Sequence, residues 1–153
     1  MADSEDERFM REALAEAKLA LARGDRPVGC VIVHRGEIVA RGSNHEFTRM
    51  SKSEHAETST LRSCAEYLFE HSNECVLYTT VEPCVMCLGA IVMANIRKVV
   101  FGAADPDRGG TQMYERVDYV RRSIRNGYVG GVLADESQRL QDAFCEPGKG
   151  ETG

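Results

Sequence analysis

Two stretches decide the fold and the chemistry of this sequence: His55-Ala56-Glu57 and Pro83-Cys84-Val85-Met86-Cys87. Histidine nitrogen and cysteine thiolate are ligands that zinc prefers in proteins. Cys84 and Cys87 are three residues apart, so on one helical turn both sulfurs can face the same point. We therefore predict that His55, Cys84 and Cys87 hold one zinc ion, with a fourth position left open for water.

Both stretches are predicted to open helices. Proline is favoured at the first helical position, so Pro83 is expected to start one helix, and Ser53 is expected to cap the other. The positive end of a helix dipole lowers the pKa of a nearby thiol and favours the thiolate that a metal requires. Two helix N-termini are therefore expected to converge on one ion.

Glu57 is expected to move protons rather than to bind the metal. A zinc ion lowers the pKa of a bound water from about 15.7 to near 7. A carboxylate beside that water can accept its proton and deliver it to a substrate. The predicted reaction is a hydrolysis in which oxygen adds to an amidine-like ring carbon, Glu57 protonates the ring nitrogen and the leaving amine, and ammonia departs.

Other interpretations of the cysteine pair fit less well. A structural zinc usually has four protein ligands, often from two C-x-x-C pairs, and the sequence has no second pair. A redox pair or a zinc-stabilised binding module would not need the carboxylate of Glu57. The remaining cysteines have apolar neighbours or helical spacing and are interpreted as small core residues: Cys30, Cys64, Cys75 and Cys145.

The composition indicates one domain of an ordinary globular class. The chain has 153 residues, of which 42% are hydrophobic and 28% charged, as in typical globular proteins. We expect a single domain over 1–146 and a disordered tail over 147–153. The acidic opening and the lack of a long apolar run predict a cytoplasmic protein without a membrane partner. A net charge of −5 favours a small substrate over a nucleic acid.

Hydrophobic periodicity predicts helices alternating with strands. We expect helices over 5–23, from 53 to 68, from 83 to 95, over 113–125 and over 135–144. Strands are expected over 28–34 and 37–42, as a hairpin, and over 75–80, 98–102 and 129–133. This order predicts an α/β fold, a three-layer α/β/α sandwich with a five-stranded mixed sheet covered by helices on both faces.

The two motifs resemble the signature of the zinc nucleobase deaminases. Over 27–104 the chain is similar to the branch of the cytidine/deoxycytidylate deaminase superfamily that contains small cytosine deaminases, guanine deaminases and tRNA adenosine deaminases. The resemblance implies a cytidine deaminase-like fold, one Zn²⁺ per chain and a homodimer. The matching segments are Arg26-Pro27-Val28-Gly29, Gly42-Ser43-Asn44, Leu77-Tyr78-Thr79-Thr80 and Cys84-Val85-Met86-Cys87-Leu88-Gly89-Ala90-Ile91.

The resemblance also implies substrate contacts. Asn44 should hydrogen-bond the substrate ring, the backbone N–H of Ala56 should contact a ring carbonyl, and the backbone carbonyl near Glu82 should receive the departing amine. From the residues alone, Asn44 could equally be a turn residue. Tyr114 follows the loop that should flank the pocket. It could contact the substrate or have a structural role.

The resemblance leaves the base open. The stretch from His55 to Cys64 is most similar to cytosine deaminases, whereas Glu82 before Pro83 is typical of purine-acting members. The stretch 99–103 is closer to the tRNA-editing branch. We rank a free nucleobase or nucleoside first, with cytosine ahead of guanine, and tRNA adenosine third.

The C-terminal part should help to decide, because in this family it often caps the pocket. The tRNA enzymes carry a basic final helix, but here 135–146 is net acidic. Asp142, Phe144 and Glu146 could close the pocket or could be helix-surface and core residues. An RNA-editing enzyme needs a basic surface, and the candidates for it are better explained as a solvated helix face: Arg121, Arg122 and Arg125.

Overall fold

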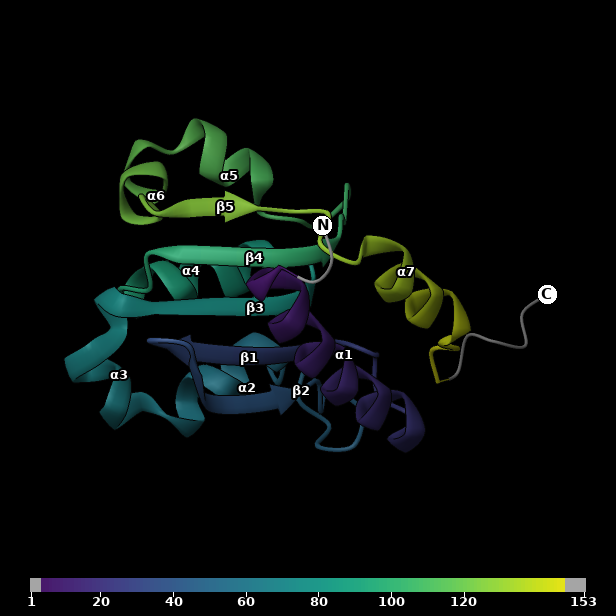
Figure 1. Ribbon diagram of the computed structural model, residues 1–153. Helices are drawn as coiled ribbons and strands as arrows, with labels where there is room; N and C mark the ends of the chain where they lie inside the picture. The colour runs from purple at the N-terminus through teal and green to yellow at the C-terminus, as the bar shows by residue number, and fades with distance from the viewer. Residues whose placement is uncertain (1–3, 148–153) are drawn as a thin grey trace.

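Five strands form one mixed sheet in the order β2-β1-β3-β4-β5 (Figure 1). In this computed structural model, which describes residues 4–147, β1 pairs antiparallel with β2 and β3, whereas β4 runs parallel to β3 and β5. The predicted mixed sheet and its hairpin are confirmed. The strands are β1 (Gly29–His34), β2 (Glu37–Ser43), β3 (Cys75–Val81), β4 (Lys98–Ala103) and β5 (Gly127–Val129).

Helices cover both faces of the sheet, which confirms the three-layer arrangement (Figure 1). One face carries α1 (Glu5–Arg23) and α7 (Ala134–Ala143). The other face carries the helices between β2 and β5, with a 3-10 turn, η1 (Ser72–Glu74), after α3. These are α2 (Ala56–Ser63), α3 (Ala65–His71), α4 (Val85–Met93), α5 (Thr111–Arg116) and α6 (Asp118–Ser123).

The alternation of strand side chains divides the core into two clusters. Val31 and Val33 of β1 face α1, while Cys30 and Ile32 of the same strand face α2 and α4. All six residues of β1 are buried, because a central strand with helices on both faces has no side open to water. This buried strand fixes the position of the loops at its two ends.

The helix that carries His55 starts later than predicted. Its N-cap is His55 and not Ser53, and Thr58 completes the cap by accepting a hydrogen bond from the His55 backbone N–H. Ser53 stays in the preceding loop, where its carbonyl accepts from the Thr58 hydroxyl at 2.7 Å. The helix also breaks at Cys64, so the single helix predicted over 53–68 is two helices, α2 and α3.

Tertiary contacts move three other boundaries. The zinc-motif helix begins at Val85 rather than at Pro83, because the Pro83 carbonyl accepts from the N–H of Gly110 and Cys84 forms a β-bridge with Gly109. The helix predicted over 113–125 is interrupted at extended Val117. The last strand is 127–129 rather than 129–133, although residues 131 and 132 still bond to the end of β4.

The prediction that the remaining cysteines are core residues is met in part. Cys30 and Cys75 are buried and Cys64 is half-buried, but Cys145 is exposed because it follows the end of α7. The tail predicted to be disordered lies, from residue 148 onward, outside the described residues. Within 4–147, none of the helices combines the length and the apolar character needed to span a bilayer.

Candidate metal centre and active site

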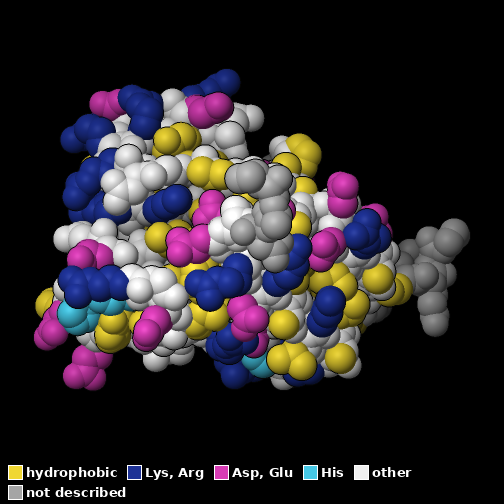
Figure 2. Space-filling model, viewed as in Figure 1, with side chains coloured by type: hydrophobic (Ala, Val, Ile, Leu, Met, Phe, Trp, Pro, Cys, Tyr) yellow, Lys and Arg dark blue, Asp and Glu magenta, His cyan; other side chains and the backbone are white. Residues whose placement is uncertain are grey.

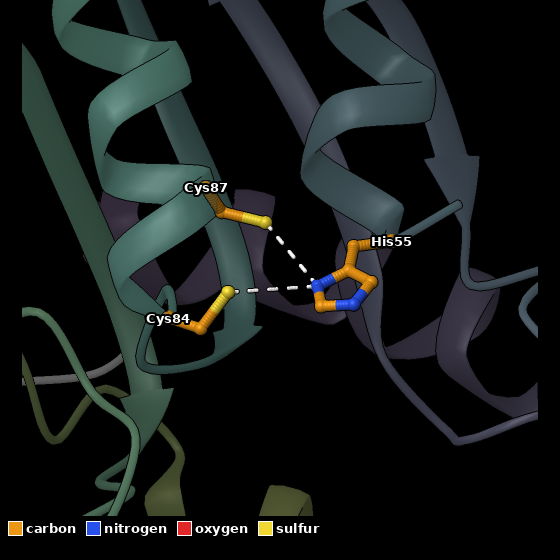
Figure 3. Close-up of side chains that lie close together, drawn as sticks. All are labelled: His55, Cys84 and Cys87. Atoms are coloured by element: carbon orange, nitrogen blue, oxygen red, sulfur yellow. Dashed lines mark hydrogen bonds between the residues drawn. The ribbon is translucent and has the colours of Figure 1, made fainter. Parts of the chain in front are cut away.

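The two sequence motifs meet at one point (Figure 3). The Nδ1 atom of His55 lies 3.6 Å from the sulfur of Cys84 and 3.4 Å from the sulfur of Cys87. A tetrahedral zinc with Zn–N near 2.0 Å and Zn–S near 2.3 Å separates a nitrogen and a sulfur ligand by about 3.5 Å. The three side chains therefore have the chemistry and the spacing of a zinc site with an open fourth position.

Two helix N-termini bring the ligands together, as predicted. His55 is the N-cap of α2, Cys84 is the N-cap of α4, and Cys87 lies on the first turn of α4. Hydrogen bonding with Cys87 and with His55 lowers the pKa of the Cys84 thiol to about 4, so a thiolate is available at neutral pH. Contact with Cys84 and burial raise the pKa of Cys87, and a metal ion deprotonates a thiol that coordinates it.

Glu57 lies buried beside the candidate metal ligands. Its side chain is buried, and its Oε2 accepts a hydrogen bond from the Thr79 hydroxyl at 3.0 Å. Burial raises the pKa of the Glu57 carboxyl, since an apolar environment disfavours the charged form. A raised pKa makes a carboxyl a better proton acceptor, as a group that carries a proton from water to a substrate must be.

A cavity of about 240 Å³ opens onto this group. Asn44, Ala56, Glu57 and Glu82 all line it, as expected for residues predicted to meet a substrate. Four charged residues that the sequence reasoning missed line it as well. The four are Arg26, Glu46, Asp105 and Arg108; none was assigned a role in the site from the sequence, and Arg26 was noted only as part of a matching segment.

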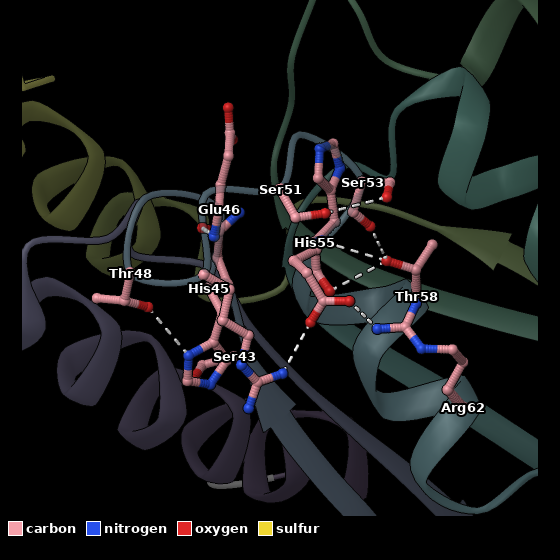
Figure 4. A network of polar contacts seen from close by, with 12 residues as sticks. Ser43, His45, Glu46, Thr48, Ser51, Ser53, His55, Thr58 and Arg62 are labelled. Atoms are coloured by element: carbon pink, nitrogen blue, oxygen red, sulfur yellow. Dashed lines mark hydrogen bonds and ion pairs between the residues drawn. The ribbon is translucent and has the colours of Figure 1, made fainter.

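Asn44 serves as a turn residue and as part of the cavity wall. It is buried, and its Oδ1 accepts a hydrogen bond from the N–H of Glu46 at 2.9 Å. Figure 4 shows the polar contacts that order the following loop: His45 points to Thr48, and Thr58 points back to Ser53. The side chain of Asn44 is thus held in place from its own loop.

Asp25 anchors the same loop from the end of α1. Its Oδ1 accepts from the N–H groups of Phe47 and Thr48, and its Oδ2 accepts from the Thr48 hydroxyl and from Arg23. Burial raises the pKa of Asp25, but these hydrogen bonds outweigh it and lower the pKa overall. The loop beside the cavity is therefore fixed by a buried carboxylate.

Tyr114 does not line the cavity, contrary to the expectation that it could contact substrate. Its ring stacks on Tyr128 of β5, with centroids 4.6 Å apart and planes within 16°. The short helix α5 turns this side chain toward the sheet, where it packs against the core. Tyr114 is therefore a packing residue.

The side chain of Glu82 is hydrogen-bonded to the segment that follows β4. Its Oε1 accepts from the N–H of Asp105, and its Oε2 accepts from both the N–H and the hydroxyl of Thr111. A Cβ atom on Gly109 would lie 2.1 Å from Oε2, so only glycine fits there. The carboxylate thus shapes the cavity wall that carries Asp105 and Arg108.

Glu82→Gln is expected to lower the free energy of unfolding by about 1–3 kcal/mol, because an amide cannot accept all three of these hydrogen bonds. Urea unfolding would measure the loss. The exposed Asp107→Asn in the same loop is the matched control and should unfold as the wild type does. A wild-type unfolding curve for Glu82→Gln would show that the carboxylate does not hold the loop.

The C-terminal segment reaches the mouth of the cavity through Arg26. The guanidinium of Arg26 lies 5.6 Å from the Phe47 ring and 5.5 Å from the Phe144 ring, and it pairs with Glu146 at 2.9 Å. Of the three residues left open by the sequence, Phe144 and Glu146 therefore flank the pocket. Asp142 instead accepts from Gln138 on the exposed surface of α7.

Comparisons with known proteins identify the family of the chain. Residues 3–103 match the model of the cytidine and deoxycytidylate deaminase zinc-binding region. The chain is 40% identical to a tRNA-specific adenosine deaminase of Bacillus subtilis, over 92% of this chain and 89% of the relative.

Two solved structures extend the comparison. A tRNA:A34 deaminase studied for A-to-I editing is 32% identical, with a TM-score of 0.74, over 87% of this chain and 98% of that one. A guanine deaminase from Bacillus subtilis is 34% identical, with a TM-score of 0.61, over 73% of this chain and 76% of that one. With a His/Cys/Cys group that could hold a metal ion and a family match over most of its length, the chain belongs to the zinc-binding cytidine and deoxycytidylate deaminase family and is a hydrolytic deaminase.

Proposed function

We propose that this protein is a tRNA adenosine deaminase that converts the adenosine at the wobble position to inosine. The observation that carries the proposal is the 40% identity to a tRNA-specific adenosine deaminase along nearly the whole chain. The sequence alone ranked tRNA adenosine third, behind free cytosine and guanine. The similarity to tRNA-acting relatives over almost all of both chains reverses that ranking.

Glu57 is the proton carrier in this proposal. Zinc, when held by His55, Cys84 and Cys87, supplies an acidic water at neutral pH. The carboxylate of Glu57 takes a proton from the attacking water and passes it to the ring nitrogen next to the reacting carbon. As the C–N bond breaks, the second proton of the water moves from the added oxygen through Glu57 to the amine and the carbonyl forms, so one water is consumed and one ammonia is released for each inosine formed.

The cavity walls orient the base. Asn44 and the backbone N–H of Ala56 line the same cavity as Glu57, so both can meet the edge of a ring placed over the zinc position. Adenine has no ring carbonyl, so the Ala56 N–H would donate to a ring nitrogen. Glu82 lines the same cavity, which supports the proposal that a backbone carbonyl near it receives the departing amine.

The substrate nucleotide must be unstacked to enter. A cavity of about 240 Å³ admits a single base, which suits an anticodon loop better than a duplex. Arg26 and Arg108 line it and can meet the flanking phosphates, but each is paired with a carboxylate. Two phosphate contacts to a single strand predict a shallow salt dependence, with a slope of log K against log salt of about −1.4.

The proposal is tested by comparing substrates under one set of conditions. A tRNA transcript with adenosine at the wobble position should give inosine, read as guanosine in the copied DNA, with a kcat/KM well above that of any free base. The same transcript with guanosine at that position is the control. Turnover of a free base without turnover of the tRNA would overturn the proposal.

Guanine is the second candidate substrate. The acidic balance of the chain and the 34% identity to a guanine deaminase favour it. It predicts that guanine yields equimolar xanthine and ammonia and that salt has little effect on KM. The substrate comparison above separates the two candidates directly.

We also propose that the chain forms a homodimer through α3 and α4. Helix α4 exposes apolar Val85, Met86 and Met93, and Phe69 on α3 is 93% exposed. Phe69 and Met93 border one surface groove together with Leu61, Leu68 and neighbouring residues. An apolar face of this kind is unusual for a free surface, and a second copy of the same chain would bury it.

Met93→Glu is expected to convert the dimer to a monomer, because the charge would be buried unpaired in the interface. Light scattering after gel filtration would give the mass. Leu19→Glu, at an exposed leucine of α1 on the other face of the sheet, is the matched control and should leave the mass unchanged. A wild-type mass for Met93→Glu would place the interface elsewhere.

A further inference from the structure

A second group of metal-ligating side chains lies at the far end of β1 from the active site. His34 ends β1, His71 ends α3, and Glu74 lies in η1. A ring nitrogen of each histidine and a carboxylate oxygen of Glu74 all lie within 4.8 Å of one another. In Figure 2, histidine side chains are visible at the edge of the molecule, over α3, beside basic and acidic groups.

His34 is held in the orientation of a ligand. Its side chain is 8% exposed, and its Nε2 lies 3.3 Å from Oε1 of Glu74. Its Nδ1 is hydrogen-bonded to the hydroxyl of Tyr67. A metal-ligating histidine typically donates its second ring N–H to such an oxygen, which fixes the ring and its tautomer. With the proton on Nδ1, the Nε2 atom is free to bind an ion between His34 and Glu74.

His71 completes the group from the solvent side. Its ring stacks on His34 with centroids 5.1 Å apart and packs on Tyr67 at 4.6 Å. Its side chain is 39% exposed, so an ion can reach the group from water. Two imidazoles and one carboxylate are a ligand set for divalent first-row transition metals, with the remaining positions filled by water.

We propose that His34, His71 and Glu74 bind a divalent transition-metal ion at a site separate from the catalytic centre. Val28 lines the active-site cavity, and His34 follows it by six residues of extended chain, which is about 20 Å. The ion would join the end of β1 to α3 and η1. Its role would be to fix these three elements to one another.

Arg35 competes with the ion for Glu74. Its Nη2 lies 3.1 Å from Oε2 of Glu74, but the Arg35 side chain is 74% exposed. An exposed guanidinium can swing into water when a cation binds. The alternative is a metal-free hydrogen-bonded chain that runs through Tyr67, His34, Glu74 and Arg35. It predicts that the protein binds no saturable nickel in the test below.

The test is equilibrium dialysis of the zinc-loaded protein against Ni²⁺, with nickel and zinc counted separately. We expect one tightly held zinc and one saturable nickel per chain. His71→Ala and Glu74→Gln should abolish the nickel and keep the zinc. Tyr67→Phe should weaken nickel binding about tenfold or more, because it removes the oxygen that fixes His34. Arg35→Gln should tighten binding up to about fivefold.

Glu66→Gln is the matched control, because it removes an exposed carboxylate from the same helix outside the group. It should bind nickel as the wild type does. No saturable nickel in the wild-type protein would overturn the site, and so would nickel binding that is unchanged in both His71→Ala and Glu74→Gln. Deaminase activity should be assayed on the same dialysed samples, so that failure of this site is distinguishable from failure of the proposed function.

Discussion

Replacing Glu57 by glutamine is expected to lower kcat by about 10²- to 10⁴-fold, the range for loss of a general acid–base group. Glutamine preserves the shape of the side chain and can still bond to Thr79, but it cannot carry a proton from water to the base. The metal ligands are untouched, so the variant should keep one zinc per chain. Steady-state kinetics together with metal analysis would measure both quantities on one preparation.

A carboxylate elsewhere on the surface provides the control for Glu57. Glu37→Gln, at an exposed position of β2, should retain wild-type kcat and zinc. Substantial activity in Glu57→Gln would remove Glu57 as the proton carrier, and loss of zinc in that variant would mean that the residue supports the metal instead.

Cys87→Ala is expected to lose zinc, activity and stability together. Cys87 is buried, and its sulfur lies 3.4 Å from Nδ1 of His55. A catalytic zinc needs three protein ligands, and Cys87→Ala leaves only two. Zinc at a thousandfold above its Kd stabilises the folded state by about 4 kcal/mol. For a chain of this size that corresponds to a fall in Tm of about 8–16 °C, which calorimetry would measure.

Cys145→Ser is the control for this loss, because Cys145 is exposed and outside the metal group. It should match the wild type in Tm and in zinc content. Chelation of the wild-type protein should reproduce the Tm of Cys87→Ala. A Cys87→Ala variant that still holds one zinc per chain would show that the ion is bound by other residues.

The cysteine pair of the candidate metal site could be predicted because its geometry is local. Three residues of separation on one helical turn bring Cys84 and Cys87 together whatever the rest of the fold does. The sheet was also predictable, since the buried run of β1 and the hairpin with β2 are properties of adjacent residues. His55 was predicted for a chemical reason instead, because a catalytic zinc needs a third protein ligand besides the two cysteines.

Features that depend on contacts outside the motif itself could not be predicted from the sequence. Ser53 is a good cap by residue type, but Thr58 bonds to it from within the helix and His55 takes the cap position. Tyr114 follows a flanking loop, and only the position of Tyr128 shows that its ring is stacked in the core. The role of Glu82 depends on three donors from a loop more than twenty residues away.

The charge argument was the weakest guide to substrate. A net charge of −5 favours a small substrate, but it describes the whole surface rather than the cavity. At the cavity itself Arg26 and Arg108 are present, each beside a carboxylate. Whole-chain charge therefore says little about the proposed substrate, which is one unstacked nucleotide with its two neighbouring phosphates.

The most direct test of hydrolytic deamination is the reaction of zinc-loaded protein with wobble-adenosine tRNA in water enriched in ¹⁸O. The account predicts that the inosine carries one ¹⁸O atom on the ring carbon that lost the amine, with one ammonia released per inosine. Glu57→Gln should form the same product far more slowly. Inosine without the label, or intact adenosine alongside fully zinc-loaded wild-type protein, would contradict the account.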